Sequence, residues 1–131
     1  MRFLLDTHIW VWMSLEPWRI TSEVNHILGD PNNELSVSAV SVWEMVLLLE
    51  KKRIKLGENL QAWVANSQRD LSLREIPLSW EVALDLPFSP LVHQDPADRL
   101  LVATARVFDL ILVTSDRRIL GTKDVRVLAN A

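Results

Sequence analysis

Short apolar runs alternate with amphipathic segments along the chain. Runs typical of buried strands stand at 3–5, 35–37, 110–113 and 125–128, with a weaker one at 71–76. Segments with apolar residues three to four positions apart, or with helix-start residues, predict helices at about 9–13, 21–28, 40–52, 60–69, 80–83, 96–108 and 116–120. Strands that alternate with helices indicate a parallel sheet with helices on both faces, so we expect an α/β fold.

Residues with strong positional preferences set the ends of these helices. Asp95 is a good N-cap and Pro96 suits the first helical position, which puts Asp98 in the first turn of the helix after it. Thr7 is the expected N-cap of the first helix, and Glu16-Pro17 ends that helix. Pro87-Phe88-Ser89-Pro90 is expected to form a rigid connector.

Four acids occupy comparable places in this pattern. Asp6 and Asp116 directly follow strand-like runs, whereas Glu44 and Asp98 fall in early turns of predicted helices. In parallel sheets, binding sites gather outside the carboxyl ends of the strands. We therefore expect the four carboxylates on one rim of the sheet.

Carboxylates crowded on one rim would repel each other, and a hard divalent cation is a natural compensation. Oxygen ligands without Cys or His favour Mg²⁺, for which Mn²⁺ can substitute, over zinc. Such an ion activates water and stabilises charge on a phosphate. The chemistry that this pattern indicates is hydrolysis of phosphodiester bonds.

Composition narrows the class of protein. The 131 residues are expected to form one domain, 1–131, and the hydrophobic content of 49% with 24% charged residues is typical of a soluble globular protein. The sequence contains no cysteine, no membrane-length apolar run and no signal peptide, so we expect a cytoplasmic protein without a membrane partner. The net charge is −3, but it becomes +1 without the four acids, so a nucleic-acid partner is not excluded.

The motifs together resemble one family. Leu4-Leu5-Asp6-Thr7-His8, Ser41-Val42-Trp43-Glu44, the run 95–105 and Val113-Thr114-Ser115-Asp116 are similar to motifs of the PIN-domain ribonucleases, above all the VapC-type toxins of bacterial toxin–antitoxin pairs. The resemblance spans nearly the whole chain. It implies a three-layer α/β/α fold with a mainly parallel sheet, a Mg²⁺-dependent endoribonuclease acting on RNA, a VapB-like antitoxin and a homodimer.

The resemblance also assigns roles to residues. Asp6 and Asp98 match the family's principal metal ligands, Glu44 a ligand or water-orienting group, and Asp116 a ligand that often acts through water. Beside them stand residues that could orient a carboxylate or a metal-bound water, or touch substrate, namely Thr7, Thr114, Ser115 and Arg99. Arg99 has two interpretations, a contact to RNA phosphate or a pair with a neighbouring acid.

Alternatives remain at this stage. Asp95 competes with Asp98 for the catalytic role, although its place before Pro96 favours a capping role. A metal-dependent phosphatase or phospho-acceptor domain also keeps an Asp after its first strand, but phosphatases commonly carry a second Asp where this chain has His8. A non-catalytic PIN-like binding module is the third possibility, and the complete set of acids counts against it. The RNA target is not readable from the sequence.

Several other residues invite a functional interpretation. His8, His26 and His93 are interpreted as structural or exposed, and the basic run 51–55 as a solvated helix end or an RNA-facing patch. Trp10 and Trp12 lie two apart on one short helix and cannot both face the core. One of them is therefore a candidate contact for the antitoxin, which could also insert an Arg among the carboxylates.

Overall fold

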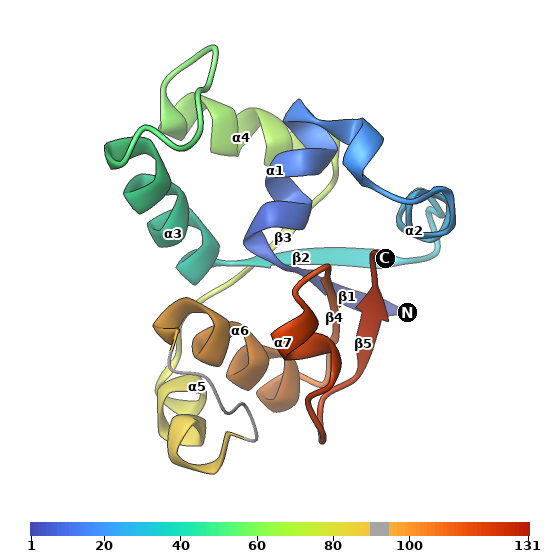
Figure 1. Ribbon diagram of the computed structural model, residues 1–131, viewed down its shortest axis with the longest axis vertical. Coiled ribbons are helices and arrows are strands. Elements are labelled where there is room, and N and C mark those ends of the chain that lie inside the picture. Colours follow the sequence, from blue (N-terminus) through green and yellow to red (C-terminus); the bar gives the residue numbers. More distant parts are fainter. Residues whose placement is uncertain (90–94) are drawn as a thin grey trace.

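A five-stranded parallel sheet forms the centre of the computed structural model, which describes residues 1–89 and 95–131. The spatial order is β3-β2-β1-β4-β5 (Figure 1). The strands are β1 (Arg2–Leu5), β2 (Glu34–Ser38), β3 (Arg74–Ile76), β4 (Ile111–Thr114) and β5 (Val127–Ala129). Phe3 pairs with Leu35 on one side and with Ile111 on the other, so β1 lies between the two halves of the sheet.

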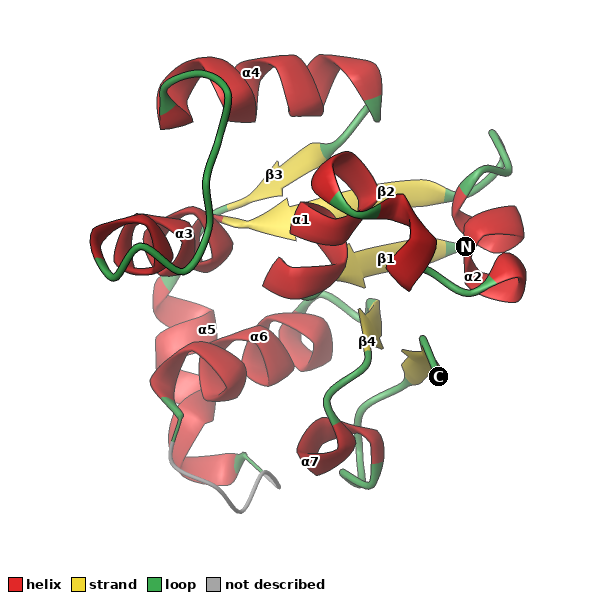
Figure 2. Cartoon of the chain, turned by 45° about the horizontal axis from the view of Figure 1, so that its top comes forward, coloured by secondary structure: helices red, strands yellow, loops and turns green. Residues whose placement is uncertain are grey.

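Helices cover both faces of this sheet, which confirms the expected three-layer α/β/α architecture (Figures 1 and 2). One face carries α1, α2 and α4, the other carries α5, α6 and α7, and α3 lies beyond the ends of the strands near the β3 side. The helices are α1 (Thr7–Leu15), α2 (Ser22–Leu28), α3 (Ala39–Glu50), α4 (Leu60–Asp70), α5 (Trp80–Asp85), α6 (Pro96–Val107) and α7 (Arg117–Leu120), with 3₁₀ turns at η1 (Pro17–Arg19) and η2 (Leu86–Phe88).

Side chains along each strand alternate between two hydrophobic cores, as the two-residue period of a strand requires. Phe3 and Leu5 of β1 pack beneath α1, together with Trp10 and Met45. Leu4 points to the opposite face and packs with residues of α6 and α7. Because both faces of β1 are buried, Asp6 at its carboxyl end has a fixed position between the two cores.

Asp95 caps α6 as predicted, and several other helices also begin at a side-chain cap. Thr21, Ser38, Asn59, Ser79 and Asp95 each accept a backbone N–H bond at the start of a helix. The expected N-cap of the first helix is wrong. Asp6 holds that position without capping through its side chain, and Thr7 is already helical. The predicted connector at 87–90 is partly helical, since η2 spans Leu86–Phe88, and Pro90 lies outside the described residues.

The helices of this fold are short. Among residues 1–89 and 95–131, no helix has the length and apolar character that crossing a membrane requires.

Candidate active site

The four predicted acids line one cavity of about 310 Å³. Asp6 directly follows β1, and Asp116 comes shortly after β4, the strand that pairs with β1. Glu44 enters from α3 and Asp98 from the first turn of α6. The chain leaves β1 and β4 toward different parts of the fold here, and such a switch point is where open α/β sheets usually bind ligands.

The Thr114 hydroxyl takes part in two hydrogen bonds that connect the residue after β1 with the loop after β4. The Thr114 hydroxyl donates to Asp6 Oδ2 at 2.7 Å and accepts a bond from the Asp116 backbone N–H at 3.0 Å. Asp6 is 6% exposed, and burial raises the pKa of its carboxyl, against the opposing effect of the Thr114 bond. Thr114 therefore fixes one oxygen of Asp6 and places Asp116 at the same time.

Glu44 carries a carboxyl oxygen that lacks a hydrogen-bond partner. Its Oε1 atom is buried and accepts no bond from the described part of the chain. Burial raises the pKa of Glu44 against the opposing effect of the nearby Thr7 hydroxyl, and the charges of Asp6 and Asp95 raise it further. Thr7, the first residue of α1, is fully buried, and its hydroxyl hydrogen-bonds to Ser41 Oγ at 2.8 Å. That bond fixes α1 against the first turn of α3.

The carboxyl of Asp98 is strongly perturbed. Burial raises its pKa from 3.8 to about 7, and the charges of Asp95, Asp6, Asp116 and Glu44 add to the effect. Only 6% of the residue is exposed. A carboxyl with such a pKa exchanges its proton near neutral pH, and strongly perturbed acids in a cavity are characteristic of functional sites.

Arg118 places a positive charge among these carboxylates. Its Nη2 atom lies 2.9 Å from Asp116 Oδ2 and 3.5 Å from Asp98 Oδ2, and its Nε donates to Asp116 Oδ1 at 3.2 Å. Asp116 Oδ1 also accepts the Arg118 backbone N–H at 2.9 Å, as the N-cap of α7. The guanidinium thus joins two of the four acids.

Ser115 and Arg99 are held by structural hydrogen bonds. The Ser115 hydroxyl donates to the Asn130 carbonyl at 2.7 Å and accepts from its side-chain amide at 2.8 Å, so it ties the loop after β4 to the chain end. Ser115 nevertheless lines the cavity. Arg99 does not line this cavity or the larger one beside it, and its Nη2 donates to the Leu86 carbonyl at 3.2 Å.

Asp95 has the capping role that the sequence indicates, since its Oδ1 accepts the backbone N–H groups of Ala97 and Asp98 at 3.0 and 3.4 Å. It also lines the acidic cavity and raises the pKa of Asp98. His8 is exposed and lies in the same cavity, whereas His93 falls outside the described residues.

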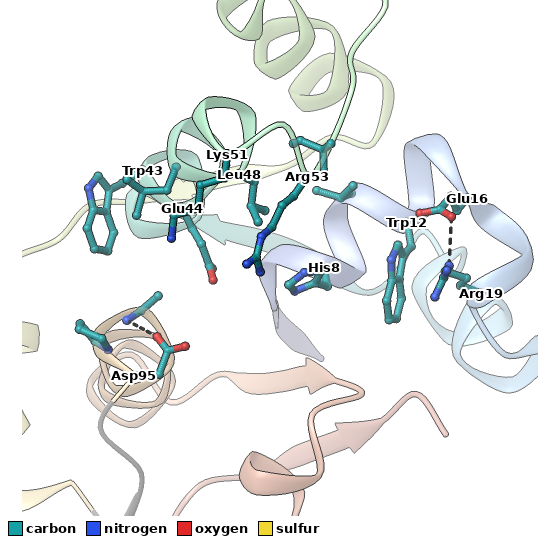
Figure 3. Close-up of a pocket in the computed structure, with 15 residues that line it drawn as sticks. His8, Trp12, Glu16, Arg19, Trp43, Glu44, Leu48, Lys51, Arg53 and Asp95 are labelled. Carbon is teal, nitrogen blue, oxygen red and sulfur yellow. Dashed lines mark hydrogen bonds and ion pairs between the residues drawn. The ribbon is translucent and has the colours of Figure 1, made fainter.

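A larger cavity of about 670 Å³ adjoins the acidic one and shares His8, Trp12, Glu44 and Asp95 with it. Figure 3 shows the Arg53 side chain reaching from the chain after α3 into this space, toward His8 and Glu44. The remaining lining comes mainly from α1, η1, α3 and the start of α6 and includes Val11, Glu16, Arg19, Trp43, Leu47, Leu48, Lys51 and Ile54. The basic run after α3 therefore does border the site.

The two tryptophans of α1 face different environments, as their spacing requires. Trp10 is fully buried and donates from its indole N–H to Ser67 Oγ at 2.7 Å. Trp12 is partly buried, lines both cavities, and lies beneath the guanidinium of Arg19 at 5.2 Å. Trp12 is thus the residue of this pair that a partner can reach.

Sequence reasoning missed Arg118 and underestimated His8 and Asp95. The signal for Arg118 was its place two residues after Asp116, at the start of a short helix, where a long side chain can fold back on the cap. Whether it does so depends on where Asp98 lies, and only the fold supplies that.

Fold and site together define a small α/β domain with clustered acids at the carboxyl ends of its strands. The PIN domain model matches residues 3–125. Ribonuclease VapC22 of Mycobacterium tuberculosis is 35% identical over 119 residues, which cover 88% of each chain. The chain therefore belongs to the PIN-domain family, among the VapC-type ribonucleases.

Solved structures share the fold across nearly the whole chain. VapBC2 of Rickettsia felis, bound to a DNA fragment from its promoter, superimposes with a TM-score of 0.73 at 17% identity, covering 98% of both chains. VapBC of Salmonella typhimurium, bound to DNA, gives 0.68 at 16% identity and covers 100% of this chain and 99% of that chain. FitAcB of Neisseria gonorrhoeae gives 0.63 at 23% identity and covers 99% and 98%.

Proposed function

We propose that this protein is a Mg²⁺-dependent endoribonuclease toxin that hydrolyses RNA phosphodiester bonds and is neutralised by a cognate VapB-like antitoxin. The observation that carries the proposal is the convergence of Asp6, Glu44, Asp98 and Asp116 on one cavity. In three of the four, Asp6, Glu44 and Asp98, burial raises the pKa. A cluster that is costly to hold as bare anions is well suited to bind a cation.

The donor set fits a hard divalent cation, because it consists of carboxylate oxygens and includes a buried Glu44 oxygen without a partner. Within the described residues, no three acids or histidines already stand in a metal-ligand arrangement. Asp6 and Asp98 would be the principal ligands, with Glu44 and Asp116 beside them. When bound, the ion supplies an activated water and offsets charge on the phosphate, and Mn²⁺ could replace Mg²⁺.

The residues around the acids prepare the site. Thr114 holds Oδ2 of Asp6 in place through its hydroxyl. The bond from Thr7 to Ser41 holds α1 against α3, which keeps Asp6 and Glu44 in register. Because the pKa of Asp98 lies near 7, part of the protein at neutral pH must lose the Asp98 proton before this carboxyl can bind an ion.

The larger cavity is the proposed path of single-stranded RNA. Single strands bind where cations follow the backbone and aromatic rings accept bases. The cavity supplies Arg53 and Lys51 as cations and Trp12 and Trp43 as rings, and it opens beside Glu44. RNA that lies in it would bring a phosphodiester to the acids, while Arg99 contributes to packing rather than to substrate contact.

The antitoxin and a second copy of the chain are the proposed protein partners. The structural neighbours from Rickettsia, Salmonella and Neisseria are VapBC and FitAB assemblies, which supports an antitoxin for this chain. Support for a homodimer comes from the exposed apolar residues on and around α5, namely Leu78, Trp80, Leu84 and Phe88. Sedimentation of the isolated protein tests the dimer. We place this activity in the cytoplasm, where RNA and antitoxin meet.

The function is tested by incubating purified protein with a single-stranded RNA and Mg²⁺, with and without excess chelator. We expect cleavage that the chelator abolishes and that Asp6→Asn and Asp98→Asn each remove. Asp70→Asn is the matched control, because it removes the same charge from an exposed side chain outside the cavity. Full cleavage in chelator would refute the metal mechanism. If the folded wild-type protein binds RNA but cleaves none of the RNAs tested, that result would favour a non-catalytic binding module.

A further inference from the structure

Arg118 occupies the position between two proposed metal ligands. Its Nη2 atom contacts Oδ2 of both Asp116, at 2.9 Å, and Asp98, at 3.5 Å. Its Nε contacts the second oxygen of Asp116 at 3.2 Å. The guanidinium therefore already engages three of the four side-chain oxygens of these two acids.

Those contacts compete with a cation for the same atoms. A carboxylate oxygen that accepts a charged hydrogen bond must give up that bond, or share it at a cost, when it turns toward a metal ion. A guanidinium and a divalent cation also repel each other at such separations. We propose that Arg118 is the resident counter-ion of the acidic site and that a divalent cation binds only by displacing its side chain from Asp98 and Asp116.

The side chain of Arg118 can move away from the two acids without disturbing the backbone. It is 58% exposed, whereas the side chain of Asp98 is 8% exposed, so the cation lies on the solvent side of the pair. An Arg side chain on a surface helix can swing out by rotations about its own bonds. Arg118 stands in the first turn of α7, whose backbone is fixed by the Asp116 cap through bonds that do not involve the guanidinium. Displacement therefore leaves the fold intact.

This inference rests on the proposed function, because it requires that the acids bind a metal ion. The test measures the binding of Mn²⁺ to the purified protein by calorimetry, at fixed pH and without RNA. Arg118→Gln removes the competing cation, and Arg117→Gln is the matched control, since it removes an equal charge from the exposed neighbour. Asp98→Asn shows whether the measured binding occurs at this site.

We expect Arg118→Gln to bind Mn²⁺ at least about threefold more tightly than Arg117→Gln, the gain expected from releasing a largely exposed ion pair. Arg118→Lys keeps the charge but loses the fork that spans both acids, so its affinity should fall between wild type and Arg118→Gln. Equal or weaker Mn²⁺ binding by Arg118→Gln, with unchanged circular dichroism and Asp98-dependent binding, would overturn the inference and leave the proposed function standing. Absence of Asp98-dependent binding in the wild type would overturn both.

A second readout follows the side chain itself. In ¹H–¹⁵N spectra, the Nε–H resonance of Arg118 should shift as Mg²⁺ is added, because its bond to Asp116 breaks. The resonance of Arg126, whose Nη2 pairs with Asp109 2.9 Å away, serves as an internal reference. An Arg118 resonance that stays fixed at saturating Mg²⁺ would overturn the displacement.

Discussion

Replacing Asp98 by Asn should make the metal-free protein more stable at neutral and alkaline pH. Asp98 is nearly buried beside other acids, and its pKa rises from 3.8 to about 7. The folded protein thus holds this proton more tightly than the unfolded chain. The resulting destabilisation is absent below pH 3.8, grows between pH 3.8 and about 7, and is complete above that.

The size of this effect follows from the pKa difference. A rise from 3.8 to about 7 costs up to about 4 kcal/mol of folding free energy above pH 7. Asn carries no charge and has nearly the same shape, so it avoids this cost. It also loses the contact to Arg118, which as a largely exposed partner is worth about 0.2–1 kcal/mol. We therefore expect the free energy of unfolding to rise by about 3 kcal/mol at pH 8, and by less than about 1 kcal/mol at pH 4.

Urea unfolding in excess chelator, at several pH values from 4 to 8, measures this difference. Asp70→Asn is the control, because it makes the same chemical change at an acid whose side chain is exposed. Adding Mg²⁺ should reverse the order at pH 8, since the ion stabilises only a site that binds it. An Asp98→Asn variant that is no more stable than wild type at pH 8, or a gain that is equally large at pH 4, would refute the reasoning.

Three further predictions concern the same region. Mn²⁺ affinity, measured by calorimetry, should increase from pH 6 to pH 8, because Asp98 must lose its proton to bind the ion, and a flat profile would contradict its pKa near 7. Trp12→Ala should weaken antitoxin binding at least tenfold in a titration. Trp18→Ala should leave the affinity unchanged, because Trp18 is 75% exposed and lies outside both cavities. Equal affinities of the two variants would exclude Trp12 as a contact. Thr114→Val should lower stability by about 1–3 kcal/mol in urea unfolding, because Asp6 loses a buried hydrogen bond, and an unchanged midpoint would argue against that bond.

Local chemistry explains why much of the fold could be predicted. The N-cap at Asp95 and the helix after Pro96 depend on residues within one turn, so the sequence alone places Asp98 in the first turn of α6. The strand before Asp6 is likewise visible as an apolar run, and both of its faces are buried as expected. The gathering of the acids at one cavity then follows from the rule for parallel sheets.

What the sequence could not show depends on contacts between distant segments. Arg99 faces the Leu86 carbonyl because η2 packs beside α6, and nothing near Arg99 in the sequence signals that neighbour. Thr7 does not cap the first helix, because its hydroxyl bonds to Ser41 of α3 instead. The partners in these contacts, Leu86 for Arg99 and Ser41 for Thr7, lie 13 and 34 positions away in the sequence.

The acids of this site are each held in a different way, and the differences determine what binding of a cation must change. Asp6 is engaged by the neutral hydroxyl of Thr114, which can remain in place when the other oxygen binds an ion. Asp98 holds a proton near neutral pH. Asp116 is paired with Arg118. A divalent cation would therefore have to displace the guanidinium of Arg118 and any proton held by Asp98, while the hydrogen bond from Thr114 to Asp6 stays in place. Because both departing groups carry positive charge, the net charge of the site would change little, which keeps a compact cluster of acids stable with and without the ion.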